Sequence, residues 1–280
     1  SGKQGPVSPG QAEFKGDIIT EREVSDLSVF DGKKALYVGF GKSALDMATF
    51  AVEQASEVHH LFRTPRWMVP FRILGVHYSR LLFCRMGTFL MPSWVQPNAV
   101  EAFIHRNLGF LVRSNWRLVQ SIVRLQKYLL GVGKSTAVKD RLASLTPKHD
   151  IVSDFRSASA MQPQLYLKHI ANERLVPHQG ELQAFTESGV VLENGRTIDC
   201  DLAVLSLGSG SPTFPFLPEK YRQLLESEPD GVQLYRHLVH PDIPRLAFAG
   251  FNHGFMHVPA VEVGMLWLSA VLTGDLTLPD

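Results

Sequence analysis

Leu36-Tyr37-Val38-Gly39-Phe40-Gly41-Lys42-Ser43-Ala44-Leu45-Asp46 joins a short apolar run to a helix-like stretch through a GxGxxA turn, and this turn decides the fold. Gly39 allows the tight bend between strand and helix, and Gly41 lets the backbone approach a pyrophosphate. Because Ala44 is small, the helix can pack close to the strand, and its first N–H groups then point at the phosphates. The sequence therefore predicts a dinucleotide-binding turn, with these candidate cofactor-binding residues: Gly39, Phe40, Gly41, Lys42, Ser43 and Ala44.

The residues on both sides of this turn support that interpretation. Residues 35–38 are an apolar run typical of a buried parallel strand, and residues 44–54 carry apolar side chains at helical spacing. A second apolar run, residues 58–62, follows at the distance expected for the next strand. The pattern predicts an α/β fold with a Rossmann-like nucleotide-binding domain.

The residues after the second apolar run indicate which dinucleotide binds. NAD-binding proteins usually carry Asp or Glu here, which accepts a hydrogen bond from the ribose 2′-OH. This chain has Arg63-Thr64-Pro65-Arg66 instead. Two guanidinium groups and a hydroxyl suit a 2′-phosphate, because arginine offers a planar fork of donors. The alternative is that both arginines are ordinary loop residues. Beside the glycine turn they favour NADPH, with Arg63, Thr64 and Arg66 as candidate contacts.

The composition is that of a globular protein in a reducing compartment. The chain is 45% hydrophobic and 20% charged, with a net charge of +1, which is ordinary for such proteins. Cys84 and Cys200 lie far apart without metal-ligand spacing, so we expect neither a disulfide framework nor a metal site. No uncharged apolar run reaches the length of a transmembrane helix. We expect a cytoplasmic location and no nucleic-acid partner.

A central stretch differs in charge from the rest of the chain. Residues 72–148 hold twelve lysines and arginines against Glu101 and Asp140, a net charge of +10, whereas the whole chain carries +1. We expect this stretch to be mostly helical. Residues at helical spacing give it an apolar face (Val112, Trp116, Val119, Val123) and a basic face (Arg113, Arg117, Arg124, Lys127). The basic face is either solvated or a contact surface for a membrane or an acidic partner.

The C-terminal half returns to short strands and ends in a helix. Residues 190–198 surround an Asn-Gly pair and predict a β-hairpin. Residues 201–208 predict a buried strand that ends at Gly208, and residues 246–250 predict another strand. Residues 259–272 begin with proline and stop before Gly274, which predicts a helix.

In order and spacing, five segments resemble the flavin-containing monooxygenases, which use NADPH and FAD. Residues 39–46 are similar to the NADPH-binding glycine motif of that family, and residues 62–67 to its 2′-phosphate loop. Residues 201–208 resemble the strand that enters the family's Ala-Thr-Gly motif. Residues 234–250 resemble the strand that leads back to the flavin, and residues 260–279 resemble the closing helix.

The resemblance implies three parts. Residues 1–29 are then a lead-in from the FAD-binding domain. Residues 30–207 form the NADPH-binding domain with a helical insertion at about 72–148. Residues 208–280 form the returning C-terminal part of the FAD-binding domain. The family's first glycine motif, which holds the FAD pyrophosphate, precedes these parts and has no counterpart in the 280 residues. We therefore expect an N-terminal FAD-domain partner or a homo-oligomer.

The resemblance also points to residues near the flavin. Gly208 ends the strand that enters the altered Ala-Thr-Gly motif. The loop 250–259 precedes the last helix, whose first N–H groups would meet the flavin. Asn252 and His253 of this loop are the candidate contacts. The alternative is an aromatic-rich loop that only packs.

The implied activity is insertion of one oxygen atom from O₂ into a small organic substrate, through a flavin hydroperoxide formed after NADPH reduces the flavin. The cofactors carry this chemistry, so no catalytic side chain is assigned. Thr20 and Val24 stand where the family signature has His and an aromatic residue, and Ser206-Leu207 alter the Ala-Thr-Gly motif. The chain is therefore a fragment or a divergent member. The alternative is a non-catalytic NADPH-binding module or partner subunit.

Overall fold

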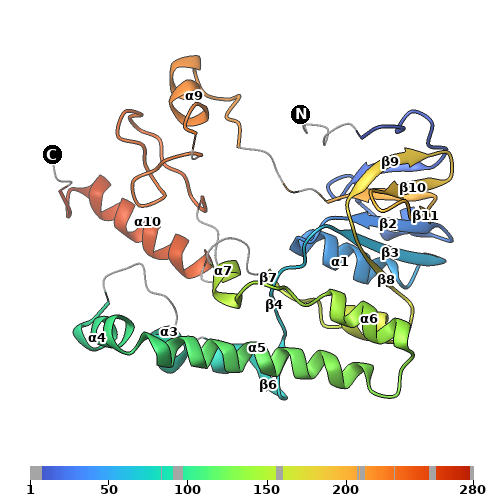
Figure 1. Ribbon diagram of the computed structural model, residues 1–280. Coiled ribbons are helices and arrows are strands. Elements are labelled where there is room, and N and C mark those ends of the chain that lie inside the picture. Colours follow the sequence, from blue (N-terminus) through green and yellow to red (C-terminus); the bar gives the residue numbers. More distant parts are fainter. Residues whose placement is uncertain are drawn as a thin grey trace. The chain divides into compact units, whose positions relative to one another are not determined.

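The computed structural model describes most of the chain and divides it into two compact units (Figure 1). The first unit is Ser1–Gly208 and the second is Ser209–Asp280. The described residues are 8–82, 84–90, 97–155, 160–206, 208, 212–229, 231–251 and 257–277. Each unit is described by itself.

A five-stranded parallel sheet forms the centre of the first unit. Its spatial order is β1-β12-β2-β3-β8, with bounds Asp17–Thr20, Leu202–Leu205, Lys34–Val38, Glu57–Phe62 and Val176–Gln179. Neighbouring strands are parallel throughout, and Leu205, Val38 and Leu61 are aligned at one edge. The strands β12 and β2 are apolar on both faces, as expected for central parallel strands. Pro177 is accommodated because β8 is an edge strand.

The two faces of this sheet are covered differently. Three helices pack on the face that carries Tyr37 and Phe62, namely α1 (Lys42–Ala51), α6 (Thr136–Ser144) and α8 (Tyr166–Ala171). Leu36 and Leu61 on the other face contact a three-stranded antiparallel sheet of β9 (Leu182–Thr186), β10 (Gly189–Leu192) and β11 (Thr197–Asp199). The alternation follows from the period of two in a strand. Strands β10 and β11 confirm the expected hairpin, and Gly195 adopts a φ of +78° in its turn.

The central basic stretch is mostly helical, as predicted. Two short strands, β5 (Arg72–Ile73) and β6 (Val76–His77), lead into α2 (Tyr78–Leu82), α3 (Arg85–Leu90), α4 (Ala99–Asn107) and α5 (Gly109–Gly131). After α6 come α7 (Ile151–Phe155) and β7 (Ala160–Met161), which pairs with β4 (Met68–Val69). Trp67, Trp116 and Val123 form a separate apolar cluster there. Within the described residues, no helix combines the length and apolarity needed to span a bilayer.

One assignment within this stretch is wrong. Lys127, expected on the basic outer face of α5, has a relative exposure of only 9%, whereas Arg113, Arg117 and Arg124 are exposed. Lys127 lies one helical turn after Val123, on the side of α5 that packs against α6. The buried face of α5 is therefore wider than its apolar residues indicate.

Two short elements near the N-terminus complete the first unit. Strand β1 adds to the sheet beside β12, and a 3₁₀ turn, η1 (Leu27–Phe30), leads into β2. The mixed composition of residues 1–29 does not indicate this strand.

The second unit has a small apolar core around Phe214, Leu225 and Ile243. It contains α9 (Glu219–Glu226) and α10 (His257–Thr273). Helix α10 confirms the expected closing helix, although it begins two residues before Pro259. The strand expected at residues 246–250 is wrong: Ala247 makes only an isolated bridge to Val239.

Candidate functional site

The glycine turn connects the carboxyl end of β2 to the N-terminus of α1. Gly39 has a φ of +131°, and a Cβ atom there would lie 2.2 Å from the carbonyl oxygen of Ser206. The Gly39 N–H donates to the carbonyl oxygen of Leu61 at 2.9 Å. The turn is therefore in contact with the ends of both neighbouring strands, and only glycine fits its first position.

The N-terminus of α1 is open at this turn. Gly41 is the N-cap residue, and no side chain caps the helix. A Cβ atom at Gly41 would meet no atom within 4 Å. Lys42 and Ser43 are exposed, whereas Ala44 is buried against the sheet. Because the first N–H groups of a helix lack intrahelical acceptors, this end provides donors and room for a phosphate.

Lys42 forms an ion pair with Asp46 one turn along the same helix. This pair holds a positive side chain at the rim of the turn, where it adds to the helix-terminal N–H groups in attracting an anion. A dinucleotide pyrophosphate fits this donor set.

A buried histidine contacts the backbone of the glycine turn. His60 on β3 is fully buried, and its Nε2 lies 2.5 Å from the carbonyl oxygen of Gly39. Its Nδ1 lies 2.5 Å from the hydroxyl of Tyr166. Burial lowers the pKa of His60 to about 4, so the ring is neutral at pH 7. The carbonyl oxygen can only accept, so Nε2–H donates to Gly39 and the Tyr166 hydroxyl donates to Nδ1.

Sequence reasoning did not identify this pair. His60 occurs in an apolar strand and Tyr166 lies more than one hundred residues later, so no local spacing connects them. The only signal in the sequence is a polar ring at a strand position that should be buried, which requires a hydrogen-bond partner.

The arginine loop follows β3 directly, at the same sheet edge as the glycine turn. Arg63 is exposed, and its Nη1 lies 3.4 Å from Glu181 Oε1. The Nη1 of Arg66 lies 3.9 Å from Asp154 Oδ1. Thr64 is also exposed. The ion pair of Arg63 is exposed and weak, so its guanidinium can turn to a ligand, whereas the carboxylate near Arg66 is buried. The structure brings all of the predicted nucleotide residues to one edge.

Asp154 fixes the end of the arginine loop. Its carboxylate is 4% exposed and accepts from the backbone N–H of Trp67 at 2.6 Å. The Nε2 of His149 is 2.7 Å away. Trp67 in turn donates through its indole N–H to the carbonyl oxygen of His149 at 2.7 Å. Arg66 is therefore attached to a rigid neighbour, which favours a defined position for its guanidinium.

The residues expected near the flavin are only partly described. Gly208 follows β12 and has a φ of +86°. The hydroxyl of Ser206, two residues earlier, is buried and has no hydrogen-bond partner among the described residues. Asn252 and His253 lie outside the described residues, as does Leu207. Ser206 lies beside Gly39, and its carbonyl oxygen is the atom that a side chain at Gly39 would meet.

The remaining histidines do not assemble a metal site in the part of the chain that the structure describes. His59 Nδ1 and His178 Nε2 are 3.1 Å apart, and Arg196 Nη2 is 3.3 Å from His178 Nδ1. Burial, together with these neighbours, lowers the pKa of His178 to about 3. A guanidinium beside a neutral imidazole is a structural contact and disfavours a metal cation.

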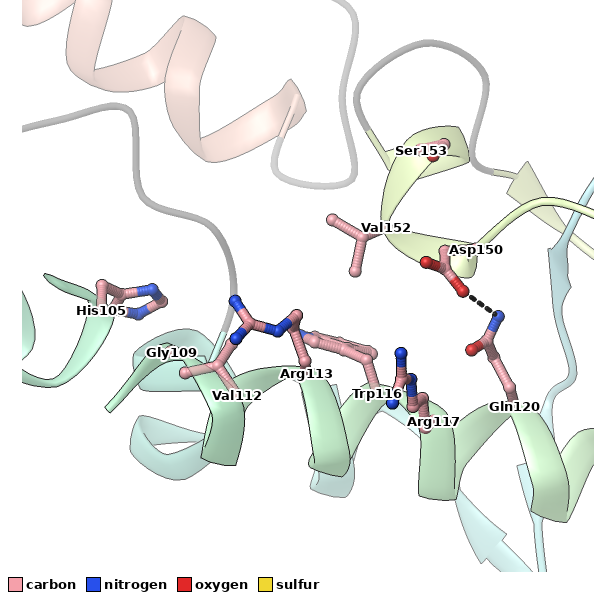
Figure 2. Close-up of a pocket in the computed structure, with 10 residues that line it drawn as sticks. All are labelled: His105, Gly109, Val112, Arg113, Trp116, Arg117, Gln120, Asp150, Val152 and Ser153. Atoms are coloured by element: carbon pink, nitrogen blue, oxygen red, sulfur yellow. Dashed lines mark hydrogen bonds between the residues drawn. The ribbon is translucent and has the colours of Figure 1, made fainter. Parts of the chain in front are cut away.

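A cavity of about 610 Å³ lies beside α5 in the first unit (Figure 2). Arg113 and Arg117 project from α5 around Trp116, and Gln120 Nε2 donates to Asp150 Oδ1 at 3.5 Å. None of its lining residues belongs to the glycine turn or to the arginine loop. The cavity has the size of a small-molecule site, but it is separate from the nucleotide edge.

Comparisons with known proteins agree with this arrangement. The flavin-binding monooxygenase-like family matches residues 6–126. The "Probable flavin-containing monooxygenase 1" of Arabidopsis thaliana is 26% identical over 98% of this chain and 52% of its own length. Flavin-containing monooxygenase 3 of Homo sapiens is 24% identical over 97% of this chain and 45% of its own. The chain thus spans about half the length of the curated relatives it matches.

Solved structures show the same fold. The crystal structure of cyclohexanone monooxygenase from Rhodococcus sp. Phi1 bound to NADP⁺ matches with a TM-score of 0.62 at 15% identity. The match covers 98% of this chain and 58% of that chain. At this identity the likeness establishes the α/β fold with its parallel sheet.

Proposed function

We propose that this chain belongs to the flavin-containing monooxygenases, which it resembles over nearly its whole length, and that it is the NADPH-binding part of an NADPH- and FAD-dependent monooxygenase. Such an enzyme inserts one oxygen atom from O₂ into a small organic substrate. Three observations of relatives support the cofactors: the matching family is flavin-binding, one matching structure holds NADP⁺, and another holds FAD and NADP.

The observation that carries the proposal is the convergence of two nucleotide-recognition elements at one sheet edge. The open N-terminus of α1 offers N–H donors to a pyrophosphate, and its Gly39–Ala44 turn leaves space for it. Arg63, Thr64 and Arg66 follow the adjacent strand, where a 2′-phosphate would lie. Two arginines beside a glycine turn are not expected in an exposed loop that binds no ligand.

When bound, NADPH supplies a hydride and FAD supplies the chemistry of oxygen activation. The residues of this chain bind and orient. His60 holds the Gly39 carbonyl in place, so the turn keeps its shape without a ligand. Gly39, Phe40, Gly41, Lys42, Ser43 and Ala44 hold the pyrophosphate. Gly208, Asn252 and His253 are assigned to the flavin side from the resemblance of their segments to the family.

The domain assignment belongs to the same proposal. Residues 30–207 form the NADPH-binding domain, which contains the helical insertion at about 72–148. Residues 208–280 form the C-terminal part of an FAD-binding domain, and residues 1–29 connect that domain to the NADPH-binding domain. The separation of the structure into two compact units after Gly208 supports the second boundary. A cytoplasmic location, and contact of the exposed Arg113 and Arg117 with anionic lipid, complete the assignment.

The experiment is a pair of nucleotide titrations. We expect NADPH to bind far better than NADH. Arg63→Ala removes a charge-assisted pair worth about 1.5–3 kcal/mol, so NADPH should bind about tenfold more weakly or worse and NADH should change little. Arg22→Ala, an exposed arginine on the lead-in, is the matched control. Equal losses of NADPH and NADH affinity in Arg63→Ala would refute the assignment of Arg63.

A non-catalytic NADPH-binding module is the second candidate, and one observation favours it. Thr20 occupies the signature position where the family has His, and its hydroxyl and N–H both donate to the Glu23 carboxylate, at 2.8 and 2.7 Å. A side chain engaged in this local turn is not available for cofactor chemistry. NADPH oxidation with O₂, measured with this chain joined to a FAD-binding segment of the enzyme, distinguishes the two candidates.

A further inference from the structure

A second cavity lies between α5 and α6, and none of its lining residues belongs to the glycine turn. It measures about 330 Å³. Three of the eight residues that line it are cationic: Arg124 and Lys127 on α5, and Lys139 on α6. The other lining side chains include the hydroxyls of Tyr128 and Thr146, and none is acidic. Three cations around one cavity repel each other unless an anion neutralises them.

No ion pair compensates these charges in the part of the chain that is described. The ion pairs found there involve neither Arg124, Lys127 nor Lys139. The guanidinium of Arg124 lies 5.5 Å from the centre of the Trp67 ring, and the ammonium of Lys127 lies 5.8 Å from it. Aromatic contacts of this kind contribute modestly and leave the charge in place.

Lys127 is a buried cation with a single hydrogen-bond acceptor among the described residues. It is more than nine-tenths buried, and its Nζ donates to the carbonyl oxygen of Leu145 at 2.8 Å. An ammonium group has three donors, and the described residues provide only this one acceptor. Burial and the neighbouring Arg124 lower the pKa of Lys127 to about 8. Burying a cation without a counter-ion is costly, so such a group is usually paired or binds an anion.

Helix α6 packs on the end of α5 beside the cavity. Gly131 ends α5, and a Cβ atom there would lie at ordinary contact distance, 3.4 Å from Lys139 and 3.5 Å from Leu142. Lys139 therefore lies next to the end of α5 and lines the cavity. One helical turn separates Arg124 from Lys127 and Tyr128, so the three residues lie along one side of α5, where Lys127 is buried and Arg124 and Tyr128 are exposed.

We propose that Arg124, Lys127 and Lys139 form a binding site for a phosphate group between α5 and α6. Guanidinium and ammonium donors together with two hydroxyls suit a tetrahedral anion of two negative charges. The phosphate is that of free phosphate or of a phosphomonoester, because the pyrophosphate and the 2′-phosphate of NADPH are assigned to the glycine turn and to the arginine loop. Lys127 also lines a crevice of about 10 Å³ together with Phe40 and Arg66. The site does not depend on the proposed monooxygenase function.

Thermal unfolding and calorimetric titration with inorganic phosphate test the site. Phosphate should raise the Tm of the chain, since a ligand that binds only the native state stabilises it. Sodium chloride at equal ionic strength should raise the Tm less. Lys127→Met removes the buried charge at similar volume. It should raise the Tm without phosphate, weaken phosphate binding about tenfold or more, and abolish the phosphate-dependent rise in Tm.

Further variants separate the site from general charge effects and from the nucleotide site. Lys139→Gln, at an exposed position, should also weaken phosphate binding, whereas Arg117→Gln on the same helix but outside the cavity should leave it within about twofold. If NADPH and phosphate compete, and Lys127→Met weakens NADPH more than NADH, the three cations belong to the nucleotide site and the proposal is overturned. If NADPH and phosphate bind together, phosphate is a separate ligand, as proposed. Equal effects of phosphate and chloride, or equal phosphate affinity in Lys127→Met, Arg117→Gln and the parent chain, would overturn the proposal.

Discussion

The hydrogen bonds beneath the glycine turn make a sharp prediction for Tyr166→Phe. This change removes one hydroxyl and keeps the ring. Tyr166 is 2% exposed and His60 is fully buried, and burial raises the pKa of Tyr166 well above its ordinary value, so the hydroxyl stays protonated and donates. In the variant, His60 Nδ1 becomes a buried acceptor without a donor.

The magnitude follows from that lost partner. Leaving a buried polar group unsatisfied costs about 1–3 kcal/mol. We expect the free energy of unfolding of the first unit to fall by that amount. For a unit of this size the Tm should fall by about 2–4 °C per kcal/mol. Denaturant unfolding followed by circular dichroism measures the change, and an unchanged m-value would show that the native fold is retained.

Tyr128→Phe is the matched control, because Tyr128 is 69% exposed. Its removal of a hydroxyl should change the free energy of unfolding by less than about 0.5 kcal/mol. If the two variants lose the same stability, or if Tyr166→Phe loses none, the Tyr166–His60–Gly39 contact does not support the turn and the reasoning fails.

Two further predictions concern acid and the flavin. Folding lowers the pKa of His60 from 6.5 to about 4. The free energy of unfolding is therefore at its full value above pH 6.5. It decreases as the pH falls from 6.5 through 4, by up to about 3 kcal/mol, because the unfolded state binds the proton more tightly. Comparing pH titrations of the parent chain and His60→Phe isolates this loss, and parallel curves would contradict it. Oxidation of NADPH should appear only when FAD is supplied by the rest of the enzyme, and an absorption spectrum with a stoichiometric flavin band for residues 1–280 alone would contradict this expectation.

The nucleotide-binding edge could be predicted from sequence because its signals are local. Glycine at fixed spacing, a strand before it and a helix after it lie within about twenty residues, so periodicity and turn chemistry suffice. The Asn194-Gly195 hairpin is predictable for the same reason. The prediction of a strand at residues 246–250 was wrong, because an apolar run does not form a strand without a neighbouring strand to pair with along its length.

The supporting residues could not be predicted, because their roles depend on distant partners. Tyr166 reaches His60 only after α8 packs on the sheet, and nothing in either local sequence indicates the pair. Lys127 was expected on an exposed basic face, because its charge favours exposure although its helical position is that of a buried residue. Its burial results from the packing of α6 against α5, which is a tertiary contact.

The shape of the glycine turn has a consequence for binding. Gly39 is held at three points: its N–H by Leu61, its carbonyl by His60, and its Cα by the close approach of Ser206. A turn fixed in this way pays little ordering entropy when a dinucleotide arrives. Arg63, by contrast, is exposed and makes only a weak ion pair, so it loses side-chain freedom on binding. Affinity for the pyrophosphate should therefore depend on the preformed turn, whereas selectivity for the 2′-phosphate should depend in part on a side chain that moves, that of Arg63.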